Sequence, residues 1–152
     1  KQRAPTRARP STPQETLATT RAFSAADVAA FLALSGDANP IHETGRHGGG
    51  DGDTRPLLPG LLTASLFPGL VGTAAPGSVY ASQTLRFIAP APINVPVTAT
   101  AVVEAVAPLP PRGPARTFAA RATLRTRAWA GGVMVVDGTA VALLPRERGG
   151  WG

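Results

Sequence analysis

The stretch PGLLTASLFPGLVG, residues 59–72, decides the fold, because it is strongly apolar and contains no charged side chain. Its large apolar residues recur three to five positions apart, which predicts a mostly buried helix that begins near Gly60. Pro68 falls inside this helix and is expected to kink or shorten it, since proline has no amide proton and clashes with the preceding turn. A helix without charge must be wrapped by other parts of the chain.

The sequence after this helix is nearly all predicted strand. Alternation of apolar and polar residues marks four segments, and Gly131-Gly132 is a good tight turn between the last two. Asp137-Gly138 is interpreted as a bulge, because a turn there would leave strands too short to be useful. The four predicted strands are 78–88, 95–106, 117–129 and 133–144. One long central helix wrapped by an antiparallel β-sheet predicts an α+β chain with the hot-dog fold.

A shorter helix is predicted over residues 25–34, ahead of the central one. Ser24 and Asp27 have the spacing of a capping box at its start, and Gly36 supplies the stop. The turn that leaves this helix has the sequence GDANPIH, residues 36–42, and holds a carboxylate, an amide and an imidazole within six positions. Such a concentration of functional groups in an otherwise alanine-rich region makes this turn the first candidate for a site.

The composition limits the classes of function. A chain of 152 residues is most simply one domain with a real core. The absence of cysteine excludes disulfides, thiolate metal sites and a cysteine nucleophile. No apolar run is long enough to span a membrane, so no membrane insertion is expected. Fifteen Lys and Arg residues face nine Asp and Glu residues, and this surplus favours an anionic partner.

The expected organisation is a basic, Pro- and Arg-rich tail over residues 1–18, a domain over residues 19–146 and a short C-terminal tail over residues 147–152. The stretch KQRAPTRARPSTPQ carries four positive charges, three prolines and no acid, a composition that does not order by itself. An Arg-rich, acid-poor leader resembles the remnant of an organellar transit peptide, which suggests a mitochondrial location. A solvated tail on a cytoplasmic protein is the alternative.

Three segments together resemble the MaoC-like, or hydratase 2, family: GDANPIH, then PGLLTASLFPGL, then PGSVYASQTLRFIAPAPINVPVTATAVV. The resemblance covers roughly residues 23–145, and its GDxNPxH pattern is specific because it precedes a correctly spaced central helix. The chain departs from the pattern at two places. Many relatives have His-Gly where this chain has Pro59-Gly60, and often a small polar residue where it has Pro68.

The resemblance implies a lyase of fatty-acid metabolism, an (R)-specific enoyl-thioester hydratase that is equally a 3-hydroxyacyl-thioester dehydratase. It assigns Asp37 and His42 as the catalytic pair, and elementary chemistry agrees, because the two side chains can share one water molecule. The backbone N–H of Gly60, at the positive end of the central helix, is expected to meet the thioester oxygen. The turn is expected to be supported by Gly36, Asn39 and Pro40.

The expected partners follow from the same resemblance. The substrate is carried as a thioester of coenzyme A or of acyl carrier protein, and no cofactor is expected. A homodimer is expected, because pairing two sheets edge to edge would cover an exposed edge strand. Contact with substrate phosphates or with the carrier is assigned to four arginines: Arg86, Arg121, Arg125 and Arg127.

Plainer interpretations stand beside these. Asp-x-Asn-Pro is a common turn sequence, and His42 would then be a capping or core residue. His47 lies among glycines and is interpreted as solvent-exposed. Two histidines without a cysteine argue against a metal site, and none is predicted. The arginine stripe is alternatively a solvated face of the sheet.

Two functional hypotheses of different class remain. The first is the hydratase or dehydratase described above. The second is a hot-dog subunit recruited as a structural or RNA-contacting component of a larger, mitochondrial assembly, with weak or no catalysis; the formal net charge of +6 and the basic tail support it. A thioesterase is a weaker third alternative, since hot-dog thioesterases generally lack the GDxNPxH motif.

Overall fold

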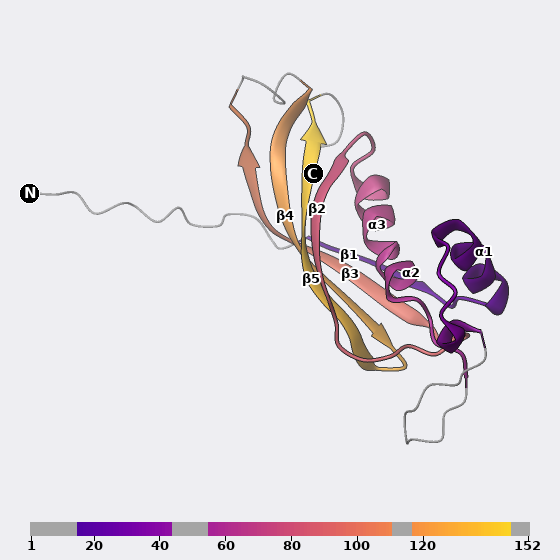
Figure 1. The fold of residues 1–152 in the computed structure, drawn as a ribbon. Helices are drawn as coiled ribbons and strands as arrows, with labels where there is room; N and C mark the ends of the chain where they lie inside the picture. The colour runs from indigo at the N-terminus through magenta and orange to yellow at the C-terminus, as the bar shows by residue number, and fades with distance from the viewer. Residues whose placement is uncertain (1–14, 44–54, 111–116, 147–152) are drawn as a thin grey trace, which may run out of the picture.

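The computed structural model describes residues 15–43, 55–110 and 117–146. Within these ranges a five-stranded antiparallel sheet in the order β1-β3-β4-β5-β2 curves around one helical segment (Figure 1). This arrangement confirms the predicted α+β hot-dog fold. The strands are β1 (Thr16–Arg21), β2 (Val79–Phe87), β3 (Val97–Pro108), β4 (Phe118–Ala130) and β5 (Val133–Pro145).

The central helix consists of two pieces, α2 (Gly60–Ala64) and α3 (Leu66–Ala74), which meet at Ser65. Pro68 cannot donate a hydrogen bond to the Ala64 carbonyl, and its ring crowds that carbonyl. The α-helical pattern is interrupted at Ser65, as expected for a proline that kinks or shortens the helix. No helix in the described part of the chain is long and apolar enough to cross a membrane.

Helix α1 (Ala25–Ser35) begins with the predicted capping box. The Asp27 amide donates to Ser24 Oγ at 3.2 Å, and the Ser24 amide donates to Asp27 Oδ2 at 2.8 Å. Gly36 ends the helix in the left-handed conformation, with φ of 71°. Figure 1 shows that α1 lies beyond α2, on the side away from the sheet. The turn that follows α1 therefore comes back toward the start of the central helix.

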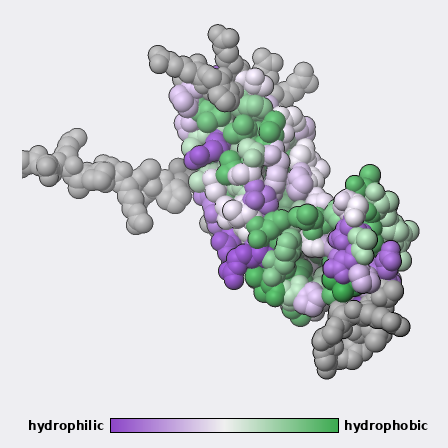
Figure 2. Space-filling model, viewed as in Figure 1, coloured by the Kyte–Doolittle hydropathy of each residue, from purple (hydrophilic) through white to green (hydrophobic). Residues whose placement is uncertain are grey.

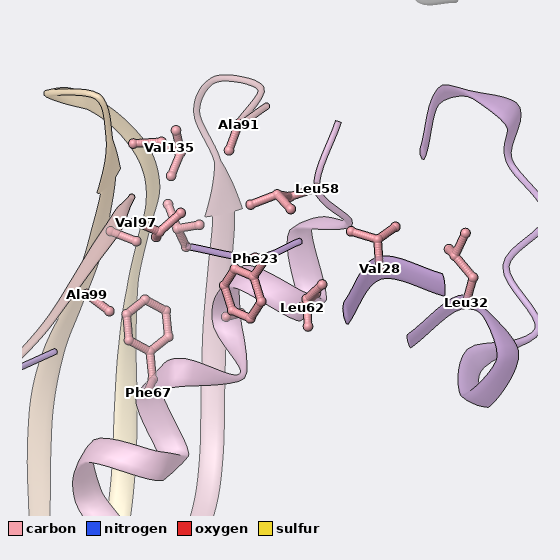
Figure 3. Packing of buried hydrophobic residues seen from close by; sticks show 14 residues of the cluster. Phe23, Val28, Leu32, Leu58, Leu62, Phe67, Ala91, Val97, Ala99 and Val135 are labelled. Carbon is pink, nitrogen blue, oxygen red and sulfur yellow. The ribbon is translucent and has the colours of Figure 1, made fainter. Parts of the chain in front are cut away.

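The core lies between the helical segment and the inner face of the sheet. Phe67 of α3 is fully buried, and in Figure 3 its ring lies beside Ala99 of β3. The inner face carries many alanines, whose small side chains leave room for the aromatic ring. Phe23 and Val28, at the start of α1, belong to the same buried cluster and attach α1 to the domain.

The four strands predicted after the central helix are confirmed, with ends shifted by at most two residues. The predicted hairpin turn is also confirmed: Gly131 and Gly132 have φ of 56° and 84°, which glycine adopts without strain. In β4 the predicted alternation holds, because Leu124 is fully buried while Arg125 and Arg127 point to the opposite, outer face.

Strand β1 was not predicted from the sequence. Its TLATTR sequence lacks a clear apolar alternation, yet it pairs with β3, and Thr20 Oγ1 lies 2.9 Å from Thr98 Oγ1. β1 begins at Thr16, so the tail predicted over residues 1–18 overlaps the sheet at residues 16–18. The other tail residues, 1–14 and 147–152, lie outside the described residues, as does His47.

The bulge predicted at Asp137-Gly138 is wrong. Both residues pair in regular register with β2 and with β4, and the irregularity in β5 lies instead at Val135. Gly138 has a different function, since a Cβ there would collide with the backbone carbonyl of Thr84. The glycine thus permits a close approach of two strands rather than a bend.

Candidate active site

The turn after α1 is held by its own polar side chains. Asp37 Oδ1 accepts a hydrogen bond from the Asn39 amide at 2.9 Å, and Asn39 Oδ1 accepts one from the Ile41 amide at 3.3 Å. Pro40 opens the 3₁₀ turn η1 (Pro40–His42). These contacts bend the backbone tightly enough to bring the side chain of His42 back toward Asp37.

His42 is fixed by a backbone carbonyl from another segment. Its Nδ1 lies 2.8 Å from the carbonyl oxygen of Leu57, which can only accept, so Nδ1 carries the proton. The other nitrogen, Nε2, lies 3.5 Å from Asp37 Oδ2. In the neutral ring these two facing atoms are both acceptors. A water molecule that donates one proton to each would satisfy both, and its oxygen would keep a lone pair free.

The segment before α2 ties this pair to the central helix. The Leu57 amide donates to the Ile41 carbonyl at 3.0 Å, and the Leu58 amide donates to the Ala91 carbonyl at 2.7 Å. Leu57 also forms an isolated antiparallel β-bridge with Pro92. The chain then enters α2 at Gly60, so the first residue of the central helix lies beside the turn that carries His42.

Gly60 lies directly against the side chain of Phe87. A Cβ built on Gly60 would lie 2.5 to 2.9 Å from ring atoms of Phe87, which is nearer than van der Waals contact permits. The Phe87 ring therefore rests against the α-carbon of Gly60. Phe87 itself is 55% exposed, at the end of edge strand β2. Any larger residue at position 60 must displace this ring.

Asp37, His42 and Gly60 line one pocket of about 500 Å³. Apart from them and two hydroxyl-bearing residues, its wall is largely apolar. Figure 2 shows hydrophobic surface around α2 and the turn after β2, where this pocket opens. The other lining residues are Phe31, Ser35, Ile41, Leu57, Leu58, Pro59, Leu61, Thr63, Phe87, Ile88, Ala89, Pro90, Ala91, Val135 and Val136. A reactive polar pair at the rim of an apolar pocket suits a substrate with a polar head and a hydrocarbon tail.

The arginines predicted to contact phosphates or a carrier lie on the outer face of the sheet. Arg125 donates to both Asp137 oxygens, at 3.0 and 2.7 Å, and Arg127 donates to Asp137 Oδ1 at 3.2 Å. Arg86 of β2 is the register partner of Asp137, and Arg121 lies further along β4. None of these four arginines lines the pocket, which is built on the inner face. The structure thus separates them from Asp37 and His42.

Sequence reasoning missed three site features. Leu57 acts through its carbonyl, which leaves no signal in the choice of side chain. From the sequence, Phe87 looks like an ordinary strand residue, because its contact with Gly60 is seen only in the folded structure. Thr63 is hidden in a helix that is otherwise apolar. Among the described residues no three His, Cys, Asp or Glu side chains gather in a way that could hold a metal ion.

Comparison with known proteins gives a consistent result. The family model described as MaoC like domain matches residues 5–109. The (R)-specific enoyl-CoA hydratase of Aeromonas caviae is 41% identical over 126 residues, covering 81% of this chain and 87% of that protein. The mitochondrial 3-hydroxyacyl-[acyl-carrier-protein] dehydratase FERN of Solanum lycopersicum is 34% identical over 125 residues, covering 82% and 72%. The solved (R)-hydratase from A. caviae, described as involved in PHA biosynthesis, superposes with a TM-score of 0.72 at 38% identity, covering 91% of this chain and all of that one.

Proposed function

This chain belongs to the MaoC-like domain family, and on that premise we propose that it is a lyase that adds water to trans-2-enoyl thioesters and, in reverse, dehydrates (R)-3-hydroxyacyl thioesters. In the forward direction the water oxygen bonds to C3, and the electrons of the double bond move toward the thioester carbonyl. A proton then adds to C2. The reaction moves only water and protons, so it calls for no cofactor.

Asp37 and His42 are the proposed catalytic residues. They supply the two acceptors that hold a water molecule and take its proton, and the same pair can return a proton to C2. General acid–base catalysis of this kind contributes about 10²- to 10⁴-fold. The Leu57 carbonyl supports the assignment, because it keeps the proton on Nδ1 and leaves Nε2 as the acceptor that faces Asp37.

Gly60 is proposed to bind the thioester oxygen through its backbone N–H. Negative charge develops on this oxygen during the addition, and a fixed N–H donor in an apolar pocket stabilises it. Its position in the same pocket wall as Asp37 and His42 supports this role. Gly60→Ala would displace the Phe87 ring, which lines the pocket, and is expected to lower kcat/KM by about 10²-fold. Because alanine keeps the backbone N–H, an unchanged kcat/KM in that variant would show that the position of the Phe87 ring does not affect the reaction.

The observation that carries the proposal is the meeting of Asp37, His42 and Gly60 in one largely apolar pocket. The test is direct. The purified protein is mixed with but-2-enoyl-CoA, and loss of the absorbance of the conjugated double bond is followed. We expect turnover to the (R)-3-hydroxy product. No hydration of thioesters of either coenzyme A or acyl carrier protein would overturn the proposal.

The carrier is proposed to be coenzyme A or acyl carrier protein. One relative is named for a coenzyme A substrate and another for an acyl-carrier-protein substrate. The positive outer face, with Arg86 and Arg121, remains a proposed contact for an acidic carrier. Comparing kcat/KM for the same acyl group on the two carriers, in the wild type and in Arg86→Glu, tests both points. A contact with the carrier would appear as a raised KM with little change in kcat.

A homodimer is proposed through strand β2. This strand forms one edge of the sheet, and three apolar residues near it are about half exposed: Val79, Phe87 and Ile88. Pairing of two copies along β2 would cover this apolar edge. Because Phe87 and Ile88 also line the pocket, the acyl chain would then bind next to the interface.

A mitochondrial location is proposed on two grounds. Two plant relatives carry the word mitochondrial in their names, and the basic, acid-poor composition of residues 1–14 suits a targeting segment. Fusion of residues 1–18 to a fluorescent protein tests the idea. Import into mitochondria is expected, and a diffuse cytoplasmic signal would contradict it.

A further inference from the structure

Thr63 of α2 carries a buried hydroxyl that has no hydrogen-bond partner among the described residues. The residue is 2% exposed and lines the pocket, and within the described residues its side chain forms no hydrogen bond. Only its backbone amide is bonded, to the Pro59 carbonyl at 3.2 Å. Ser65, two residues later, behaves differently, since its hydroxyl donates to the Leu62 carbonyl at 2.6 Å. Buried hydroxyls in native proteins are nearly always hydrogen-bonded, so the one on Thr63 requires an explanation.

A comparison inside the molecule shows that the fold can satisfy such a group. Thr126 of β4 is fully buried as well, and its Oγ1 accepts a hydrogen bond from Gln83 Nε2 at 2.9 Å. These two are the buried polar residues of the described core. Thr126 is paired and does not line the pocket, whereas Thr63 lines the pocket and has no partner within residues 15–43, 55–110 and 117–146.

The position of Thr63 indicates which part of a substrate it would meet. Asp37 is at the open end of the pocket, with 38% of its side chain exposed, whereas Thr63 and its fellow lining residues Val135 and Val136 are almost fully buried. Thr63 follows Gly60 by three residues, hence on the same side of the helix and about 4.5 Å along it. If the thioester lies at Gly60, Thr63 faces acyl carbons deeper in the pocket than C3.

We infer that the Thr63 hydroxyl selects acyl chains that carry a hydrogen-bonding oxygen, as a hydroxyl or carbonyl group, beyond C3. This inference rests on the proposed function. A plain hydrocarbon chain beside Thr63 would leave the hydroxyl unpaired, which is costly, whereas an oxygen on the chain would pair with it. Sites that hydrogen-bond a substrate group discriminate against analogues that lack it. Thr63 is thus a specificity-determining residue.

The experiment compares hex-2-enoyl-CoA with hydroxyhex-2-enoyl-CoA whose hydroxyl is on C4, C5 or C6 in turn. We expect wild type to favour at least one hydroxylated chain by about five- to tenfold in kcat/KM, the size of one neutral hydrogen bond. Thr63→Val has the same shape without the hydroxyl and should abolish this preference. Thr63→Ser should keep it. Thr126→Val, the matched control, makes the same substitution at the paired buried threonine and should also keep it.

Thermal unfolding supplies a readout that does not depend on activity. Thr63→Val removes a buried hydroxyl that has no partner among the described residues and should raise Tm by about 2–4 °C. Thr126→Val removes the hydrogen bond that Thr126 Oγ1 accepts from Gln83 Nε2 and should lower Tm, even though this amide keeps the Thr84 and Thr139 carbonyls as acceptors. A lowered Tm in Thr63→Val would overturn the inference. So would equal kcat/KM for plain and hydroxylated chains in wild type, and that result would leave the proposed function intact. If neither these thioesters nor the but-2-enoyl thioesters of coenzyme A and acyl carrier protein are hydrated, both the inference and the proposed function are overturned.

Discussion

The Leu57 carbonyl accepts a hydrogen bond from Nδ1–H of His42 and so determines that Nε2 is the ring nitrogen that faces Asp37. At the scale of single residues, the sequence indicates which side chains carry the chemistry but not which neighbours hold them in place. Asp37, His42 and Gly60 were predicted because the GDxNPxH pattern, followed by a correctly spaced central helix, resembles the MaoC-like family. Leu57 could not be predicted, since every residue has a carbonyl. Phe87 could not be predicted either, because its contact with Gly60 joins a strand end to a helix start.

The ion pairs of Asp137 on the outer face of the sheet lead to a prediction of how the stability of the fold depends on pH. Burial alone would raise the pKa of Asp137, but the hydrogen bonds and charges of Arg127 and Arg125 outweigh burial and hold this pKa below its ordinary value of 3.8. The ionised Asp137 therefore stabilises the fold. Its contribution is fully present above the ordinary pKa and is lost as pH falls through the lowered, folded-state pKa.

Asp137→Asn is thus expected to lower Tm relative to wild type at neutral pH, and the difference should shrink as the solution is acidified below about pH 4. Thermal unfolding followed by circular dichroism across pH measures this. Glu104→Gln is the control, because Glu104 is exposed and forms no ion pair within the described residues. A difference in Tm for Asp137→Asn that persists undiminished in acid would contradict the account.

At the scale of elements, the strongly patterned segments were predicted and the weakly patterned one was missed. The charge-free stretch predicted the central helix, and its proline predicted that the helix is kinked or shortened; the structure places the interruption at Ser65. Strand β1 gave no such signal, because it consists mainly of threonine and alanine and is stabilised by pairing with β3. A bulge was predicted at Asp137-Gly138. The structure shows instead that Gly138 lies so close to the backbone of Thr84 that no side chain fits, and the local sequence gives no sign of this tertiary contact.

Two glycines on different elements lead to opposite predictions for the same substitution. Gly69 of α3 has an ordinary φ, and a Cβ added to it would meet no atom within 4 Å. Gly69→Ala should therefore raise the free energy of unfolding by about 0.5–1 kcal/mol, because alanine is the better helix former. Gly138→Ala should destabilise the protein, since its Cβ would collide with the β2 backbone. Urea unfolding measures both, and a stabilised Gly138→Ala would contradict the strand packing described here.

At the scale of the whole molecule, the sheet leaves β2 as an exposed edge beside the pocket. The pattern of residues within one strand does not show whether that strand lies at an edge of the sheet. Only the complete strand order shows that β2 is an edge strand. The homodimer proposed through β2 predicts a stable dimer at micromolar concentration in sedimentation experiments. Val79→Lys should weaken the dimer by placing a charge on this edge. The same substitution at Val106, which is equally exposed but on β3, should leave it unchanged. A monomeric wild-type protein would contradict the proposal.

The water held between Asp37 and His42 is the central claim, and the rate of but-2-enoyl-CoA hydration in Asp37→Asn and His42→Ala tests it most directly. Asparagine keeps the shape of aspartate but cannot take the proton. Each variant is therefore expected to keep the wild-type circular dichroism spectrum while its kcat falls by about 10²- to 10⁴-fold. Wild-type turnover in a correctly folded Asp37→Asn or His42→Ala protein would contradict the account.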